Sequence, residues 1–236
     1  MPRFSMQLTD EQIAVLSCFH DNTPERNKKE RRWESLELTK TCTAGEALAT
    51  LYPYQSPETS GLSWNERIEE ESKYREKRGR KKERIIDILR DLYGIISIHH
   101  SRVIWHYFIP PGIYPLVQNA IKTGVFEREF SDGDLYTLGV IYRRSQELRN
   151  MRQHKRYGNP RFHPTEVSKL NLKDKESTIK SLDNLVGILA VSLIWDQFKP
   201  ENTPEDYSPS FKIRYDRKRW FLPYARLPDA KKLLGI

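Results

Sequence analysis

The sequence contains only two cysteines, Cys18 and Cys42, and they do not form a CxxC pair. A zinc ribbon needs closely spaced cysteine pairs, so the sequence excludes that class of metal site, and two thiols do not suggest a disulfide framework. We therefore expect two reduced thiols in an intracellular protein. Neither a P-loop nor a glycine-rich dinucleotide motif is present, and no cofactor is expected.

Long apolar runs are also missing. The N-terminal residues MPRFSMQLTDEQ contain no apolar signal-peptide region. The longest apolar run, Leu185–Trp195, is interrupted by Gly187 and Ser192, whereas a membrane-spanning helix needs about 20 apolar residues. We expect a soluble, cytoplasmic protein without a membrane partner. Hydrophobic residues make up 37% of the 236 residues and charged residues 31%, which indicates a core divided by polar elements.

Positive charge is in excess and is clustered. The net charge is +8, and residues 73–84 contain eight Lys or Arg against two Glu. Two further clusters are residues 141–156, with six against one, and residues 211–220, with five against one. Clustered positive charge on an otherwise acidic chain is typical of a protein that binds a polyanion. The alternative is a solvated, lysine- and arginine-rich surface.

The N-terminal part of the chain predicts a series of helices. Capping-box patterns, in which a Ser or Thr is followed three residues later by Glu or Gln, predict helices over about 9–20, over about 43–51 and from 63 onward. Gly79 is expected to end or bend the third, charged helix. Apolar residues at helical spacing between 85 and 92 then predict a further helix with a basic N-terminal end.

A predicted β-hairpin follows, with strands at 95–98 and 103–109. The order of helix, short helix, basic-ended helix and hairpin resembles the winged helix-turn-helix family over about residues 8–112. The residues that carry the resemblance are TAGEALATL at 43–51, RIIDILRDLYGII at 84–96 and RVIWHYFI at 102–109. The resemblance implies that the basic-ended helix lies in the major groove of DNA and that the hairpin contacts the backbone or minor groove. It also implies that 52–79 contain an inserted charged helix.

The C-terminal part, 113–236, predicts a helical domain that ends in a basic hairpin. We expect helices at about 113–122, 131–151, 173–194 and 227–234, a loop at 158–164 and a hairpin at 211–224. Residues 97–121 and 211–236 share the order strand, basic turn, aromatic strand, proline and helix. Tandem winged domains, as in some plasmid replication initiators, would show this order. Because no extended identity joins the two stretches, we interpret the likeness as coincidence, and a second winged unit stays open.

We therefore predict a mostly helical α+β protein with winged-helix-like units that binds double-stranded DNA without catalysis. The candidate DNA-binding residues are Arg78, Arg80, Lys81, Lys82, Arg84, His99, His100, Arg102, Arg143, Arg144, Arg149, Arg152, Lys155, Arg156, Arg214, Arg217, Lys218 and Arg219. Arg80, Lys81 and Lys82 are expected at a helix N-terminus, where free N–H groups favour anions. Regulation of transcription is the first interpretation and replication initiation the second, and a homodimer remains open.

A nuclease is the third interpretation. Gly112-Ile113-Tyr114 and the stretch Tyr136–Gly139 resemble the two short motifs of the GIY-YIG nucleases, which cleave phosphodiester bonds with tyrosines, an arginine and a metal-binding glutamate. That resemblance implies catalytic roles for Tyr114, Tyr136, Arg143 or Arg144, and Glu166. The second motif has one residue too many, and 118–122 predicts helix where that family has a strand. His99 and His100 are adjacent, so on a strand they point to opposite faces, and we expect no metal site there.

Overall fold

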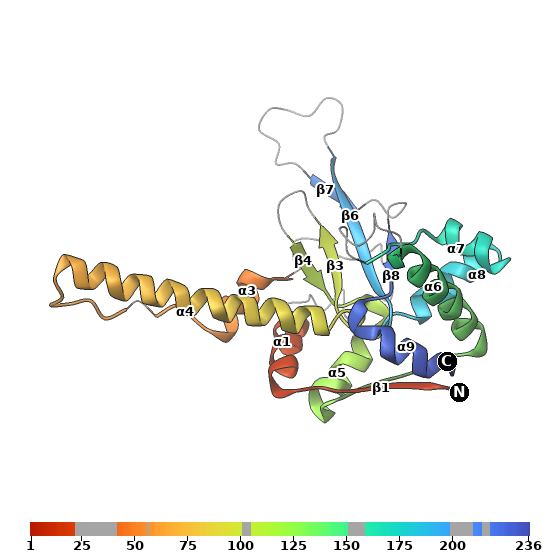
Figure 1. Cartoon of the computed structure of the whole chain (residues 1–236), viewed down its shortest axis with the longest axis horizontal. Helices are drawn as coiled ribbons and strands as arrows, with labels where there is room; N and C mark the ends of the chain where they lie inside the picture. Colours follow the sequence, from red (N-terminus) through yellow and green to blue (C-terminus); the bar gives the residue numbers. More distant parts are fainter. Residues whose placement is uncertain (22–41, 56, 101–104, 151–158, 199–209, 214–217) are drawn as a thin grey trace.

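A computed structural model describes residues 1–21, 42–55, 57–100, 105–150, 159–198, 210–213 and 218–236. The predicted α+β class is confirmed: most described residues are helical, and the helices pack around two small sheets (Figure 1). No helix within these ranges has the length and apolar character that crossing a membrane requires.

Two helices of the N-terminal half begin where the capping patterns predict. Helix α1 (Asp10–Asp21) and helix α3 (Ala44–Leu51) each follow a threonine. The hydroxyl oxygen of Thr9 accepts from the Gln12 N–H at 3.2 Å, and that of Thr43 accepts from the Glu46 N–H at 3.1 Å. These bonds satisfy N–H groups that have no partner inside the helix, so a local sequence signal sets both helix starts.

Helix α4 (Trp64–Asp91) is a single helix of 28 residues. The predicted end or bend at Gly79 is wrong, and the charged segment is the beginning of the basic helix, not a separate insertion. A glycine costs about 1 kcal/mol in a helix interior, and ion pairs one turn apart support the helix around it. None of residues 64–84 is buried, so this half of α4 projects from the body (Figure 1).

After α4 the chain forms the strands β3 (Ser97–His100) and β4 (Trp105–Phe108). A short 3₁₀ helix, η3 (Pro111–Ile113), leads into α5 (Tyr114–Thr123). Strand β5 (Val125–Glu129) then pairs antiparallel with β1 (Arg3–Gln7). These two strands were missing from the sequence-based prediction.

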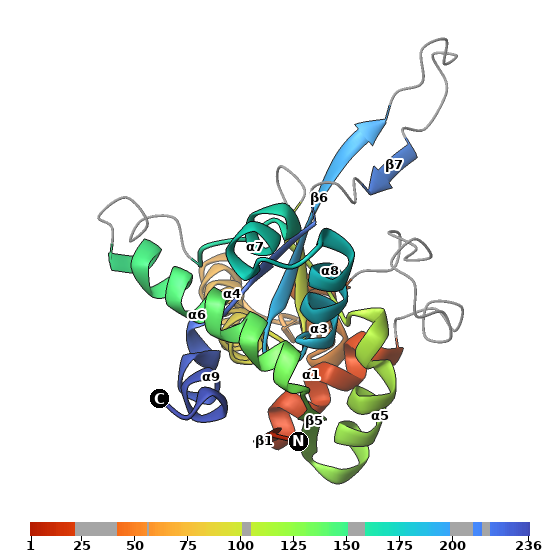
Figure 2. The same cartoon turned by 90° about the vertical axis from the view of Figure 1, so that its right-hand side faces the viewer.

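The C-terminal part contains more strand than predicted. Its helices are α6 (Asp132–Asn150), α7 (Pro164–Asn171), α8 (Lys175–Asn184) and α9 (Leu227–Leu234), and its strands are β6 (Ala190–Phe198), β7 (Ser210–Ile213) and β8 (Arg219–Phe221). The predicted helix over 173–194 is wrong beyond Asn184, because Gly187 turns the chain and the apolar residues after it enter a sheet. Helix α7 occupies a stretch left without a predicted element. The hairpin predicted over 211–224 is wrong, because β7 and β8 each pair antiparallel with β6, so the second hairpin consists of β6 and these two strands. Helices α6, α7 and α8 cover the sheet from one side (Figure 2).

The central sheet has the strand order β2-β4-β3-β6-β7, where β2 is Cys42–Thr43, and β8 also pairs with β6. Strands β3 and β6 are parallel, with Ile98 opposite Ser192. One hydrophobic cluster contains buried residues from both halves of the chain, including Leu89, Ile98 and Leu189. The sheet and the core are therefore shared by the two halves.

The two halves repeat one order of elements around the β3–β6 pair. Among the described residues, each half has three helices, a strand with an antiparallel partner strand, a 3₁₀ helix and a final helix. The first half also has the short strand β2 between α1 and α3, and in the second half the partner is β7 with β8 and the 3₁₀ helix is η6 (Tyr224–Arg226). Residues 92–96 (LYGII) and 185–189 (LVGIL) form the same turn between the third helix and the strand, and both glycines have a positive φ. The likeness that we interpreted as coincidence therefore extends to the structure.

Two arginines, the buried Arg226 and the half-buried Arg128, join the halves. Arg226, which follows the second hairpin, donates to the carbonyl oxygens of Asp91 and Tyr93 at the end of α4. Arg128, which follows the first hairpin, donates to the carbonyl oxygens of Asp183 and Val186 at the end of α8. Burial lowers the pKa of both guanidiniums, that of Arg128 to about 10. Each half thus supplies a cation to the negative end of the other half's helix.

Candidate nucleic-acid interface

The cations of α4 fall into two groups, and the first group is paired with carboxylates. Lys73 lies 2.8 Å from Glu69, Arg75 lies 3.3 Å from Glu71, and Arg80 lies 3.6 Å from Glu76, all one turn apart on exposed helix surface. Exposed pairs of this kind are weak and are screened by salt. They add a little stability to the helix, and the neighbouring carboxylates offset the charge of these cations.

Arg84 belongs to the paired group, but its partner is on another helix. Its guanidinium donates to the Glu11 carboxylate of α1 at 2.6 and 3.1 Å. This hydrogen bond is the main cause of the raised pKa of Arg84. Arg84 therefore fastens α4 to α1 at the point where α4 leaves the body.

The second group of cations has no carboxylate partner among the described residues. It consists of Arg67, near the start of the helix, and a run of four, Lys77, Arg78, Lys81 and Lys82. Two of these cations lie over tyrosine rings instead: Lys81 is 4.3 Å from the ring centre of Tyr52, and Arg78 is 5.6 Å from that of Tyr54. A ring attracts a cation without neutralising its charge, so both cations keep their full charge in fixed positions.

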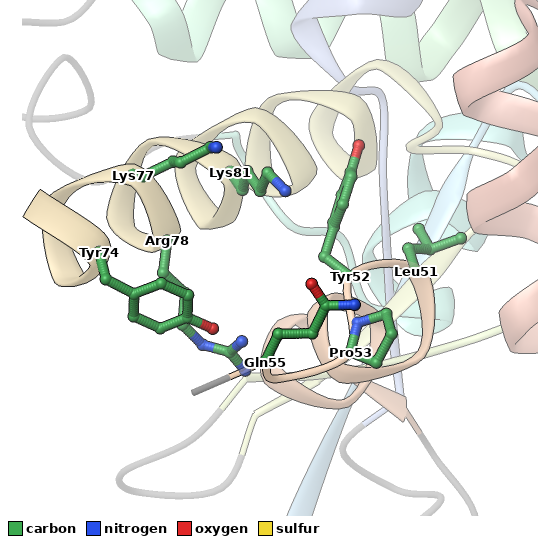
Figure 3. Close-up of a pocket in the computed structure, with 8 residues that line it drawn as sticks. All are labelled: Leu51, Tyr52, Pro53, Gln55, Tyr74, Lys77, Arg78 and Lys81. Carbon is green, nitrogen blue, oxygen red and sulfur yellow. The ribbon is translucent and has the colours of Figure 1, made fainter. Parts of the chain in front are cut away.

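Three of these cations line a hollow of about 280 Å³, which we call the α4 groove. It lies between α4 and the chain segment that follows α3 (Figure 3). The residues that line it are Leu51, Tyr52, Pro53, Gln55, Tyr74, Lys77, Arg78 and Lys81. Tyr54 packs edge-on against Tyr74 at 5.2 Å between ring centres, which fixes the segment to the helix. The lining contains no carboxylate, so the groove carries uncompensated positive charge.

Helical spacing explains why the groove lies on this face. Ile85, Ile88 and Leu92 point into the core from α4 and its end. Residues at three- and four-residue spacing before Ile85 are Lys81, Arg78 and Tyr74, so they continue the same face of the helix. Inside the body this face is apolar, and beyond the body it is cationic and aromatic.

The helix-terminus argument for Arg80, Lys81 and Lys82 is wrong. These residues lie in the interior of α4, where backbone N–H groups are bonded within the helix and cannot bind an anion. The three side chains also serve different roles: Arg80 is paired, Lys81 lines the groove, and Lys82 does neither. Their charges remain candidates for DNA contact, but the helix end does not assist them.

The first hairpin consists of β3 and β4. His99 and His100 belong to β3, where they pair with His106 and Trp105 of β4. Arg102 lies outside the described residues. Strand β2 lies against the other edge of β4, next to α3. The hairpin therefore rises beside the base of α4 (Figure 1).

The cations of α6 do not form one surface. Arg143 is exposed and Arg144 lies 2.9 Å from Glu147. The DNA-binding role predicted for Arg149 is wrong, because its side chain is only 7% exposed. It donates to the Leu222 carbonyl oxygen at 2.6 Å and lies 4.3 Å from the Tyr224 ring centre, and burial lowers its pKa. Arg152, Lys155 and Arg156 lie outside the described residues.

The cations of the second hairpin likewise differ in their exposure. Lys218, predicted to contact DNA, is buried and lies 2.7 Å from the Asp183 carboxylate, so that prediction is also wrong. Arg219 is half-buried and donates to the Lys218 carbonyl oxygen at 3.1 Å. Arg214 and Arg217 lie outside the described residues. In this region, the prediction from charge alone therefore included cations that are not available for binding.

The geometry does not bring the nuclease residues together as a site. Tyr114 is 3% exposed and packs in the core, so its side chain cannot meet a phosphodiester. Both motifs lie in helices, with Tyr136 and Arg143 exposed on α6 and Glu166 half-buried on α7. Within the described ranges, no group of three His, Cys, Asp or Glu side chains could hold a metal ion.

Comparison with known proteins adds no relative. The chain matches no protein-family model, and searches of curated proteins and of solved structures find no match.

Proposed function

We propose that this protein binds double-stranded DNA without catalysis and that the projecting half of α4 is the main contact. The observation that carries the proposal is a run of four cations between residues 77 and 82 of α4 that lack a carboxylate partner within the described ranges, namely Lys77, Arg78, Lys81 and Lys82. A helix with its side chains is about 10–12 Å across, and the major groove of DNA is about 12 Å wide. Residues 52–55 cover part of the projecting helix, so its uncovered face is the part that can enter that groove.

The order of elements supports a winged helix-turn-helix assignment within this proposal. Helices α1, α3 and α4 followed by the β3–β4 hairpin make the first unit, with α4 as the reading helix and the hairpin as the wing. Helices α6, α7 and α8 followed by β6 and its partner strands make the second. In this assignment the first unit differs from the family pattern by the N-terminal extension of α4.

Sequence-specific regulation of transcription is the first biological role that we propose. A plasmid-type replication initiator is the second, and the repeated order of elements around Gly94 and Gly187 favours it, because such initiators carry tandem winged domains. Both roles need the same duplex-binding surface, and a homodimer would fit either.

Fluorescence anisotropy with a labelled random-sequence duplex, at several salt concentrations and with or without Mg²⁺, tests the proposal. If the four cations contact phosphates, log K should fall with log salt with a slope of about −3 to −4, since each neutralised phosphate contributes about −0.9. The double variant Lys81→Ala/Lys82→Ala should bind more weakly and lower the slope by about 2. The matched control is Lys73→Ala/Arg75→Ala, which removes the same charge from paired positions.

Two results would count against the proposal. Affinity that barely changes with salt would mean that the cations are only solvated surface. Metal-dependent cleavage of the duplex that is lost in Tyr136→Phe would replace binding with nuclease activity.

A further inference from the structure

The α4 groove has a shape that a bound duplex does not fill, although three of the cations that we propose to contact the duplex line it. It is enclosed between two stretches of chain, α4 and residues 51–55, and its volume is about 280 Å³. A DNA duplex is far too wide to enter a hollow of this size, because its major groove, which is only one part of the duplex, is already about 12 Å across. The lining nevertheless combines cations and tyrosines and contains no acid. The groove is therefore suited to something narrower than a duplex that carries negative charge.

We infer that the α4 groove binds single-stranded nucleic acid and seats one unpaired nucleotide. Sites for single strands combine positive charge, which follows the phosphates, with aromatic rings that stack on bases. Lys77 and Lys81 line one wall and supply the charge, and Tyr52 and Tyr74 supply rings from opposite ends (Figure 3). The inference rests on the proposed function, because it gives the duplex-binding arm a second contact with the same polymer.

Two features of the groove support an unpaired nucleotide over other ligands. Its volume lies just below the range of about 300–1,000 Å³ that is usual for pockets of drug-sized ligands, which is adequate for one nucleotide with its chain continuing into solvent. Metal ions are disfavoured, because the lining offers cations and no carboxylate. The tyrosine contacts of Arg78 and Lys81 place both cations before any ligand arrives, so little side-chain freedom is lost on binding.

Lys77 provides the sharpest test. It lines the groove, and its side chain forms no hydrogen bond, ion pair or ring contact with the described part of the chain. Lys77→Gln should therefore fold normally while losing one charge from the groove. Lys82→Gln is the matched control: it removes the same charge from the same helix, at a residue outside the groove lining. The measurement is fluorescence anisotropy with labelled oligo-dT of about eight nucleotides, at physiological salt, where charges beyond about 8 Å are screened.

We expect Lys77→Gln to weaken oligo-dT binding about threefold or more relative to Lys82→Gln. Tyr74→Leu should weaken it about fivefold or more, since it removes a stacking ring, and its melting temperature should be recorded because Tyr74 also contacts Tyr54. Equal affinities of the Lys77→Gln and Lys82→Gln variants would overturn the assignment. So would displacement of the oligomer by inorganic phosphate at concentrations near the oligomer's own Kd, which would indicate a small-anion site.

The duplex measured in parallel separates this inference from the proposed function. Binding of duplex without binding of oligo-dT would overturn the groove assignment and leave the proposed function standing. Binding of oligo-dT with the expected variant pattern, but no binding of duplex, would retain the groove and overturn the proposed function. Failure to bind either would overturn both.

Discussion

The backbone N–H of Gly187 donates a hydrogen bond to the carbonyl oxygen of Gly94, with 3.0 Å between nitrogen and oxygen. The two glycines hold the same place in the two halves of the chain, each between the third helix and the strand that follows it. Their φ angles, +118° and +108°, lie where side chains other than glycine are rarely found. The contact joins the halves where the parallel strands β3 and β6 begin.

Gly94→Ala should be strongly destabilising for this reason. A Cβ atom at residue 94 would lie 2.5 Å from the Gly187 carbonyl oxygen, so backbone strain and a steric clash add. We expect a loss of roughly 2–5 kcal/mol in the free energy of unfolding, measured by urea denaturation. Gly79→Ala is the control, because a Cβ there meets nothing within 4 Å and should stabilise α4 by up to about 1 kcal/mol. Similar effects of the two substitutions would contradict the close contact.

Arg149→Ala should act on stability, whereas Arg143→Ala should not. Arg149 is buried and bonds the Leu222 carbonyl oxygen, so its removal leaves that acceptor unpaired and costs roughly 2–4 kcal/mol. Arg143, on the same helix, is exposed, and surface substitutions usually stay within about 0.5 kcal/mol. Thermal unfolding of both variants checks this prediction. A normal melting temperature for Arg149→Ala would show that the arginine does not support the fold.

The contrast between Arg149 and Arg143 shows that a cluster of basic residues in the sequence can include a buried, structural arginine. Ile141, Ser145 and Arg149 are four residues apart and lie on the buried face of α6. That spacing is visible in the sequence, but an arginine on an apolar face was interpreted as surface because arginine is seldom buried. Its partners, the Leu222 carbonyl and the Tyr224 ring, are more than 70 residues away, and no local pattern could have indicated them.

Local signals in the sequence predicted the helices well. The prediction failed mainly for strands, whose pairing partners lie far away in the sequence. The capping residues Thr9, Thr43 and Ser63 each precede a helix in the structure. The stretch 185–194 was assigned to a helix because a short apolar run fits a buried helix and a buried strand equally well. Only its pairing with β3 decides between them.

Only one wall of the α4 groove, the one formed by the helix, could have been predicted from the sequence. Tyr74, Arg78 and Lys81 continue the spacing of the apolar face that begins at Ile85, which could have been noticed if α4 had been predicted to run through Gly79. The other wall could not, because residues 52–55 are irregular and follow no period. The close-up in Figure 3 shows how this segment meets the helix.

Cys42 gives the fold a sensitivity to alkaline pH. The residue lies in β2 and is 3% exposed. Burial raises the pKa of its thiol from 9.0 to about 12, with the Glu46 carboxylate adding to the effect. The folded protein therefore keeps a proton that the unfolded chain loses once the pH exceeds about 9.

Between pH 9 and pH 12 the unfolded state binds fewer protons than the folded state at this site, so the free energy of unfolding should fall as the pH rises. At pH 10.5 the loss from Cys42 alone should be about 2 kcal/mol relative to pH 8, since one pKa unit corresponds to about 1.4 kcal/mol. Cys42→Ala should lower stability at pH 8 but lose about 2 kcal/mol less between the two pH values. Urea denaturation of both proteins at pH 8 and pH 10.5 measures this difference.

Cys18, Tyr93 and Tyr107, whose pKa values are also raised by burial, are present in both proteins, so their contributions cancel. Equal pH-dependent losses in the two proteins would mean that Cys42 titrates in the folded state as it does in the unfolded chain.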